Sequence, residues 1–301
     1  MNPSYKAILT EYLSWLDTLG YSEKMTASCL SAIKEFFEWI EEKQIHGINQ
    51  LTDKHINTYR SYLETRANKR RKGYLLSANH LNKIFIAIDK LLEFLHQYGM
   101  ENAPLPLRRL IKTDKTERIF KITTFTQQEI KTLYDHIPDT YPNLPAAHRQ
   151  AIHYELKLAF ALFYGCGLRR SEGFNLQIHN VDFDRKTVFV EQGKNYKDRI
   201  IPMSAGVYRE LQDYVYNYRH RLKLNHSRLF AGEIQAQILR LKHLQKICGD
   251  EQIKSKRLTL HTLRHSIATH LLQNGMSVEN IALFLGHSSL DSTQIYTHLI
   301  N

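Results

Sequence analysis

Four short segments in the second half of this 301-residue chain combine residue types that suit chemistry on a phosphate group. An arginine fork binds two non-bridging phosphate oxygens at once, and preorganised cations stabilise the charge that develops on a phosphoryl group under attack. A tyrosine hydroxyl is a competent nucleophile once its proton is taken or its developing charge is shared. The residues that make up this set are Arg169, Lys194, His261, Arg264, His287 and Tyr296.

Each segment has a plainer interpretation when it is taken alone. Arg169 follows a glycine-ended turn, where a surface arginine is ordinary, and a lysine at a hairpin tip is usually just solvated. His261 and Arg264 stand three residues apart, so they share one face of a helix. A tyrosine near a chain end is normally a core or surface aromatic, and we interpret His265 and His270 as packing or surface residues. The combination, rather than any single member, indicates phosphoryl transfer.

The sequence gives no sign of a metal or nucleotide cofactor. It has no Gly-x4-Gly-Lys-Ser/Thr loop, so no nucleotide-driven step is implied. No convincing cluster of Asp and Glu suits two-metal chemistry, so we expect a metal-free site with arginines where Mg²⁺ stands elsewhere. The three cysteines, Cys29, Cys166 and Cys248, are few and lack CxxC spacing, so we expect neither a disulfide framework nor a structural zinc site. This cysteine usage fits a reducing cytosol.

Hydrophobic periodicity predicts a helical first domain over residues 1–105. Apolar residues recur at helical spacing in four stretches, with Ser22 and Thr52 placed to cap the second and third helices and a fourth starting near Ser77. Short joints between them predict a four-helix bundle. The following segment, 106–121, starts at the second of two nearby prolines, Pro104 and Pro106, and carries six cations against two acids, which predicts a basic interdomain linker.

The second domain, residues 122–301, is predicted to be helical around a small sheet. Thr126 and Glu129 have capping-box spacing at the start of a helix. Alternating residues predict strands over 181–183, 187–192 and 199–202, with a hairpin tip between the last two. Everything after Ser204 reads as helix again. The expected fold class is therefore mainly α with a small antiparallel β-sheet.

The charge of the chain points to a polyanionic partner. The 41 Lys and Arg against 30 Asp and Glu give a formal net charge of +11, so nucleic acid or an anionic membrane is expected. No apolar stretch approaches the roughly 18 residues of a membrane span, and no strong basic amphipathic helix is present, which favours nucleic acid over a membrane. Two basic stretches are the candidate DNA contacts, although a solvated loop is the plainer interpretation of each: Arg66, Lys69, Arg70, Arg71 and Lys72, and, in the linker, Arg108 and Arg109.

In their order along the chain, the four segments resemble those of the tyrosine recombinase (phage integrase) family, and most closely its Xer-like, simple core-type members. The resemblance covers essentially the whole chain. It implies a SAM-like core-binding domain followed by a catalytic domain. It also implies site-specific cleavage and rejoining of double-stranded DNA through a covalent 3′-phosphotyrosine intermediate, without metal or ATP. The segments that carry it read Gly167-Leu-Arg-Arg-Ser-Glu172, Gly193-Lys-Asn-Tyr-Lys-Asp-Arg199, His261-Thr-Leu-Arg264-His265 and Leu285-Gly-His-Ser-Ser289, with Tyr296 nine residues after His287.

The resemblance also implies a role for each residue. Tyr296 would attack the scissile phosphate, Arg169 and Arg264 would hold it, and Lys194 would protonate the departing 5′-oxygen. Because the hairpin tip lacks the second glycine often found in the family, Lys197 stays open as an alternative to Lys194.

For the two histidines, the resemblance implies that His261 assists proton transfer at the tyrosine and that His287 hydrogen-bonds the transition state. The family also implies a monomer in solution that assembles as a tetramer on two DNA sites, with room for accessory proteins. A bacterial cytosolic, nucleoid-associated location and a role in mobile elements are expected on the same ground.

Two departures from the family pattern and two alternatives remain. Gly173 stands where a leucine is usual, which we expect to loosen the helix start by roughly 1 kcal/mol. The chain runs only five residues past Tyr296, so the C-terminal helix that docks on a neighbouring protomer in many relatives is expected to be short or absent. A type IB topoisomerase that relaxes supercoils, or a DNA-binding regulator with vestigial catalytic residues, are the alternative functions.

Overall fold

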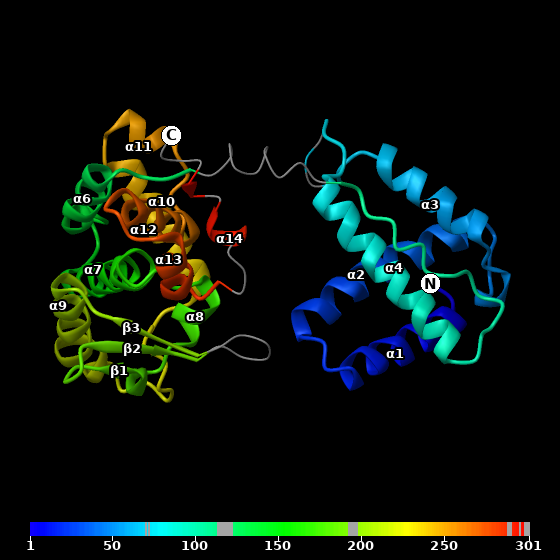
Figure 1. Ribbon diagram of the computed structural model, residues 1–301, viewed down its shortest axis with the longest axis horizontal. Helices are drawn as coiled ribbons and strands as arrows, with labels where there is room; N and C mark the ends of the chain where they lie inside the picture. Colours follow the sequence, from blue (N-terminus) through cyan, green and yellow to red (C-terminus); the bar gives the residue numbers. More distant parts are fainter. Residues whose placement is uncertain are drawn as a thin grey trace. The chain divides into compact units, whose positions relative to one another are not determined.

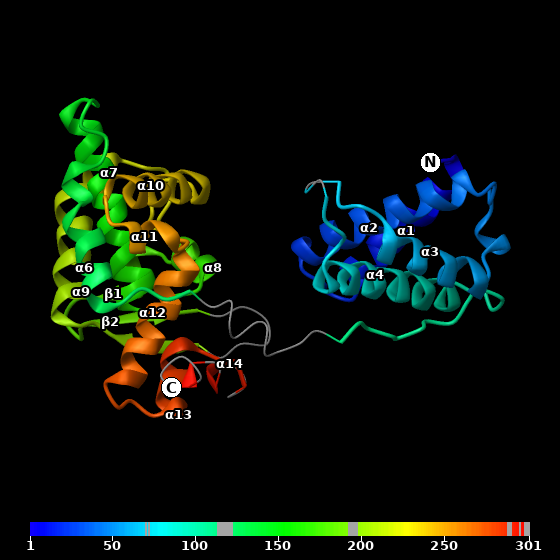
Figure 2. The same cartoon turned by 90° about the horizontal axis from the view of Figure 1, so that it is seen from above.

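The computed structural model describes residues 1–69, 71, 73–112, 123–191, 198–287, 291–294 and 296–297. The chain divides into two compact units, Met1–Asp114 and Lys115–Asn301, each with its own hydrophobic core (Figures 1 and 2). Within the described residues, no helix is long and apolar enough to cross a membrane.

The first unit contains the four predicted helices: α1 (Pro3–Thr18), α2 (Glu23–Glu42), α3 (Asp53–Thr65) and α4 (Ala78–Gln97). The hydroxyls of Ser22 and Ser77 accept backbone N–H groups at the starts of α2 and α4, as N-caps do. The helices pack around aromatic rings, among them Phe36 and Tyr59, which are fully buried with their ring centroids 5.0 Å apart. The first unit is therefore helical, as the hydrophobic periodicity predicts.

The chain segment that follows α4 packs along that helix. The nearly buried carboxylate of Asp89 accepts the N–H groups of Leu107 and Arg108, each at 3.0 Å. The side chain of Asn82 both donates to and accepts from the backbone of Ile111, at 2.9 and 2.8 Å. The first part of the predicted linker therefore lies on the first unit, and residues 113–121 of it lie outside the described residues.

The second unit is mainly helical, as predicted, with one small sheet. Thr126 and Glu129 form the expected capping box at the start of its first helix. The helices are α6 (Gln127–Asp135), α7 (Ala146–Ala159), α8 (Arg170–Asn175), α9 (Ala205–Asp213), α10 (Ile234–Ile247), α11 (Glu251–Ser255), α12 (Leu260–Gln273), α13 (Val278–Leu285) and α14 (Asp291–Gln294).

The sheet consists of three antiparallel strands in the order β1–β2–β3: Val181–Asp182, Thr187–Val190 and Arg199–Pro202 (Figure 1). Val188 pairs with Val181 on one side and with Ile201 on the other. Val188 and Ile201 are fully buried while Phe189 and Ile200 are exposed, which is the alternation that predicted the strands. The first strand ends one residue earlier than predicted, and the second ends at Val190 with Glu191 outside it. Residues 192–197, which include the predicted end of the second strand and most of the hairpin tip predicted over 193–198, lie outside the described residues.

Glycines allow the polypeptide to pass close to its neighbours where α7 gives way to α8. Gly167 has a φ of +60°, and a Cβ there would lie 2.9 Å from side-chain atoms of both Phe284 and Leu285. A Cβ on Gly173 would lie 2.6 Å from the ring of Phe163. The ring fills the space in which a larger residue would stand, so Gly173 is a packing feature of α8 as well as a departure from the family pattern.

Candidate active site

Glu172 on α8 lies between three guanidinium groups. Its carboxylate accepts hydrogen bonds from Arg169 Nη1 at 2.7 Å and from Arg199 at 2.8 and 3.2 Å, and it lies 3.8 Å from Arg264 Nη1. It also accepts the N–H of Arg169, the N-cap residue of α8, from its position in the first turn of the same helix. The carboxylate is nearly buried, as are two of the three arginines, so this small helix gathers positive charge from three parts of the chain.

The same three arginines bind the carboxyl end of α13. Arg199 Nε donates to the carbonyl of Phe284 at 3.0 Å, and Arg264 Nη2 donates to that of Leu285 at 2.9 Å. Arg169 Nη2 donates to the next carbonyl, that of Gly286. The last carbonyls of a helix lack intrahelical partners and lie at the negative end of its dipole. The end of α13 therefore attracts the three guanidinium groups and fixes their orientation. Gly286 ends the helix with a φ of +67°, which explains the glycine before His287 in the sequence.

Positive charge exceeds negative charge in the described part of this cluster. Burial and the neighbouring Arg169 lower the pKa of Arg264 to about 10, even though Glu172 opposes the shift. Burial also acts to raise the pKa of Glu172, but the hydrogen bonds and charges of Arg199 and Arg169 outweigh it and hold that pKa at about 2. A guanidinium that loses affinity for its proton in this way would gain from a bound anion.

Tyr296 lies in a small apolar cluster beside this charge. Its side chain is 1% exposed and packs with Ala268, Ile281 and Leu285. Burial raises the pKa of the phenol to about 12, and the charges of Arg264 and Arg169 act in the opposite direction. The hydroxyl is 2.8 Å from Nδ1 of His265, its one hydrogen-bond partner within the described residues. The phenol is therefore held next to α12, within reach of the electrostatic field of both arginines.

The other two histidines flank this pair. The His261 ring meets the His265 ring edge-on with centroids 4.2 Å apart, and His261 itself is exposed. The His287 ring is parallel to that of Tyr296 within 11°, with centroids 6.5 Å apart. His287 Nδ1 is 2.7 Å from the hydroxyl of Thr293, which is fully buried on α14. His287 thus links the end of α13 to the short helix that precedes the tyrosine.

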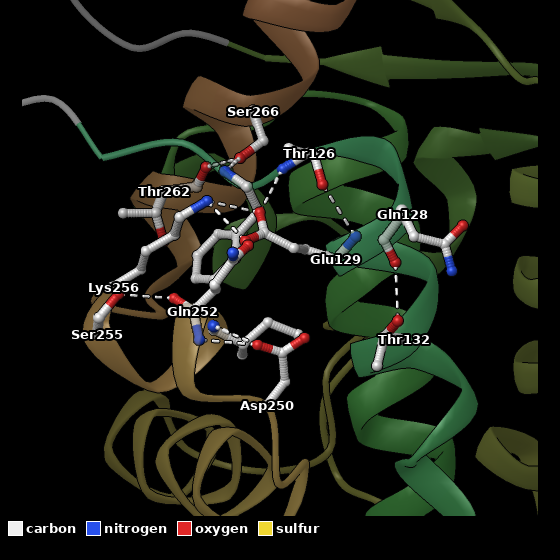
Figure 3. Close-up of polar contacts among 12 residues, drawn as sticks. Thr126, Gln128, Glu129, Thr132, Asp250, Gln252, Ser255, Lys256, Thr262 and Ser266 are labelled. Atoms are coloured by element: carbon white, nitrogen blue, oxygen red, sulfur yellow. Dashed lines mark hydrogen bonds and ion pairs between the residues drawn. The ribbon is translucent and has the colours of Figure 1, made fainter.

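The start of the second unit contacts α12 and the residues just before it (Figure 3). Ser266 accepts the N–H of Phe125 at 2.9 Å and donates to the Thr262 carbonyl at 2.8 Å. Lys256, just before α12, forms an ion pair with Glu129 at 2.6 Å, and Glu129 also closes the capping box of α6. These contacts fix the helix that supplies His261, Arg264 and His265, so its side chains are held before any ligand arrives.

The structure therefore gathers five of the six predicted catalytic residues around the end of α13, and Lys194 lies outside the described residues, as does Lys197. Sequence reasoning missed Glu172 and Arg199 as the partners of the arginines, although both stand inside the segments it singled out. It also interpreted His265 as a packing or surface residue, and it did not predict that His265 Nδ1 is the hydrogen-bond partner of the Tyr296 phenol. The signal was present as a second histidine directly after Arg264.

Among the described residues, no group of three or more His, Cys, Asp or Glu side chains is arranged to hold a metal ion.

The predicted DNA-binding cations differ in their surroundings. Arg66 is nearly buried and pairs with Glu35 at 2.6 Å, whereas Lys69 is 73% exposed and 3.4 Å from the same carboxylate. Arg108 is exposed, with Glu93 at 3.4 Å. Arg71 and Arg109 are exposed, and Arg70 and Lys72 lie outside the described residues. The internal pairing of Arg66 leaves Lys69 as the more accessible cation of the two.

Known proteins share both the sequence pattern and the fold. Residues 123–301 match the model of the phage integrase family. The chain belongs to the phage integrase family and is a site-specific DNA recombinase of the tyrosine type.

Particular relatives cover nearly all of the chain. Tyrosine recombinase XerA of Thermococcus onnurineus is 29% identical over 293 residues, which cover 96% of this chain and 90% of that protein. A tyrosine recombinase of Pseudothermotoga lettingae is 34% identical over 179 residues, 55% of this chain and 58% of that protein. The crystal structure of XerH site-specific recombinase bound to palindromic difH substrate has the same fold, with a TM-score of 0.70 at 16% identity over 97% of this chain and 91% of that one.

Proposed function

We propose that Tyr296 is the nucleophile of strand cleavage, attacking the scissile phosphate to leave a 3′-phosphotyrosyl link and a free 5′-hydroxyl. The observation that carries this proposal is a buried phenol on which the charges of Arg169 and Arg264 act. One phosphodiester is exchanged for another of similar energy, so the reaction needs no ATP. Rejoining is the reverse step with a different 5′-hydroxyl.

In this proposal the phosphate binds Arg169 and Arg264. Two of the N–H donors of Arg264 go to the carbonyls of Gly167 and Leu285, at 2.6 and 2.9 Å, so the guanidinium plane is fixed before DNA binds. Arginine has five N–H donors in total, and a fixed fork suits a tetrahedral anion. The excess of positive over negative charge around Glu172 would stabilise the additional charge of the pentavalent transition state.

The remaining roles follow the family resemblance. Lys194, or its neighbour Lys197, protonates the departing 5′-oxygen, and His287 donates a hydrogen bond to the phosphate. The contact with Thr293 fixes the direction of the His287 ring. A substrate with sulfur at the bridging 5′ position distinguishes the two lysines, because a thiolate leaves without a proton. The lysine whose alanine variant regains cleavage on that substrate is the acid.

Outside the active site, we propose that Lys69, Arg71, Arg108 and Arg109, together with Arg70 and Lys72, contact the DNA backbone, with the first unit as the core-binding domain. The protein would be a monomer in solution and a tetramer on two DNA sites, located at the nucleoid. Sedimentation with and without the target duplex tests the assembly: one species near the 35.4 kDa of the chain is expected alone, and a much larger complex with DNA.

Covalent capture of DNA tests the proposed function. Genomic fragments carrying nicks are mixed with the protein, so that cleavage releases a short strand and traps the adduct. The unaltered protein should form adducts in EDTA and without ATP, and Tyr296→Phe should bind DNA without forming them. Adducts with Tyr296→Phe, or a strict need for Mg²⁺, would overturn the proposal. Relaxation of plasmids that carry no captured site would instead indicate a topoisomerase.

A further inference from the structure

The hydroxyl of the proposed nucleophile, Tyr296, has a hydrogen-bond partner, His265, to which the family roles described above assign no function. Tyr296 Oη is 2.8 Å from His265 Nδ1, and no other hydrogen-bond partner of that oxygen occurs in the described residues. The phenol is 1% exposed, so bulk water does not replace this partner. No contact described joins Tyr296 to His261, the histidine expected to assist it.

The position of His265 is fixed by the helix that carries it. It follows Arg264 directly on α12, and the Ser266 hydroxyl after it binds the carbonyl of Thr262 and the N–H of Phe125. The rings of His265 and Tyr296 meet at 56° with centroids 5.5 Å apart, so an imidazole nitrogen rather than the ring face meets the hydroxyl. Because His265 and Arg264 are adjacent on α12, one helix places a proton acceptor beside the Tyr296 hydroxyl and a guanidinium where the scissile phosphate would bind.

We propose that His265 is a catalytic residue whose Nδ1 takes the proton of the Tyr296 hydroxyl as that oxygen attacks phosphorus. This inference rests on the proposed function of Tyr296 and extends it. A phenol is the stronger donor of the two groups and an unprotonated imidazole nitrogen the stronger acceptor, so the hydrogen bond runs from Oη to Nδ1. Nε2 then carries the ring proton of the neutral histidine.

The step balances without a further reactant. The bond from Oη to phosphorus forms while the bond from phosphorus to the 5′-oxygen breaks, and its electron pair leaves with that oxygen. The phenolic proton moves to Nδ1 and makes His265 an imidazolium. The 5′-oxygen takes its proton from the separate acid, Lys194 or Lys197. In rejoining, the imidazolium returns its proton to the tyrosine oxygen as the new 5′-hydroxyl attacks.

The surroundings keep this transfer from running before DNA arrives. Burial, and then the charges of His261, Arg264 and His287, lower the pKa of His265 to about 3. Burial raises the pKa of Tyr296 to about 12. The proton therefore stays on the phenol in the free protein. A phosphate bound to Arg264 and Arg169 would offset positive charge beside His265, and so favour its protonated form when the oxygen attacks.

The test uses His265→Asn, whose amide oxygen can accept the hydrogen bond at the Nδ1 position but cannot take a proton. Single-turnover cleavage of a captured DNA fragment should slow by about 10²-fold, within the range for a lost general base. His270→Asn is the matched control, because His270 lies on the same helix, is buried and hydrogen-bonds Tyr164 instead. Melting temperature and DNA affinity of both variants check that they fold and bind.

A nucleophile with a lower pKa separates proton transfer from positioning. With 3-fluorotyrosine at position 296, the phenol loses its proton more readily, so the fold reduction in cleavage rate caused by His265→Asn should become several-fold smaller. A substrate with sulfur at the bridging 5′ position should leave that fold reduction unchanged, because the sulfur replaces the need for the acid and not for the base. Wild-type cleavage by His265→Asn, or an equal deficit with tyrosine and fluorotyrosine, would overturn the proposal. Adducts formed by Tyr296→Phe would instead remove the proposed function on which it rests.

Discussion

Neutralising Glu172 by Glu172→Gln perturbs the charge at the centre of the arginine cluster. The pKa of this carboxyl falls from its ordinary value of 4.5 to about 2, because Arg199 and Arg169 bind the charged form more strongly than burial disfavours it. At ~1.4 kcal/mol for each pKa unit, that difference corresponds to roughly 3 kcal/mol of stability at neutral pH. Breaking a buried ion pair costs about 3–5 kcal/mol, which is the same magnitude.

The sign of the pH dependence follows from the lowered pKa. The contribution of Glu172 is complete above an ordinary pKa of about 4.5 and is lost as the pH falls toward about 2. The free energy of unfolding of Glu172→Gln should therefore lie about 3 kcal/mol below that of the unaltered protein near pH 7, and only about 1 kcal/mol below it near pH 3. Urea titrations of both proteins at the two pH values measure this difference.

The control is Glu233→Gln, which removes an exposed carboxylate 3.6 Å from Arg228 and should change stability by less than about 0.5 kcal/mol. Bound DNA should reduce the destabilisation of Glu172→Gln, because a phosphate would supply part of the missing negative charge. A loss of stability that is equal at both pH values would refute the reasoning, since it would show that Glu172 matters through its shape rather than its charge.

Three further substitutions test other features of the protein. Gly173→Ala should lower the free energy of unfolding by about 1–3 kcal/mol, because its Cβ would lie 2.6 Å from Phe163; an unchanged urea midpoint would contradict the packing. Thr293→Val removes the hydroxyl that orients His287, and should slow covalent capture by roughly 5-fold, corresponding to ~1 kcal/mol, with DNA affinity unchanged. Lys69→Ala should reduce the slope of log affinity against log salt by about one, and an unchanged slope would place this residue away from DNA.

Each of these substitutions has a matched control. Gly206→Ala also adds a methyl group to a helical glycine, but there the nearest atom is the Ser204 hydroxyl at 3.9 Å, so stability should hold. Thr293→Ser keeps the hydroxyl and should keep the rate of capture. Lys6→Ala removes an exposed cation on α1, outside the basic stretches, and should leave the salt slope unchanged.

Local signals in the sequence predicted the elements because local interactions form them. The capping box of Thr126 and Glu129 and the alternation around Val188 both reappear in the structure. The same holds for the i, i+3 pair of His261 and Arg264 on one helix. In each case the residues that carried the prediction contact one another or share one face, so no information about distant chain segments was needed.

Contacts between distant segments could not be predicted in this way. Arg199 lies 27 residues from Glu172, and His265 lies 31 residues from Tyr296, so nothing in either local pattern reveals that they meet. The consecutive carbonyls at the end of α13 that bind the three arginines are backbone groups, so the residue types at these positions do not predict the contacts. From the sequence, Gly173 is only a residue that weakens the start of a helix. Its packing role could not be predicted, because the Phe163 ring, ten residues earlier, comes close to it only in the folded chain.

The most direct test of the central claim is to identify the amino acid that holds the DNA. The covalent complex is digested with protease and nuclease, and the peptide that carries a nucleotide is sequenced by mass spectrometry. We predict a single modified residue, Tyr296, joined to a 3′-phosphate, with the 5′-end of the released strand carrying a hydroxyl. A nucleotide on any other residue, or a link through a 5′-phosphate, would contradict the account.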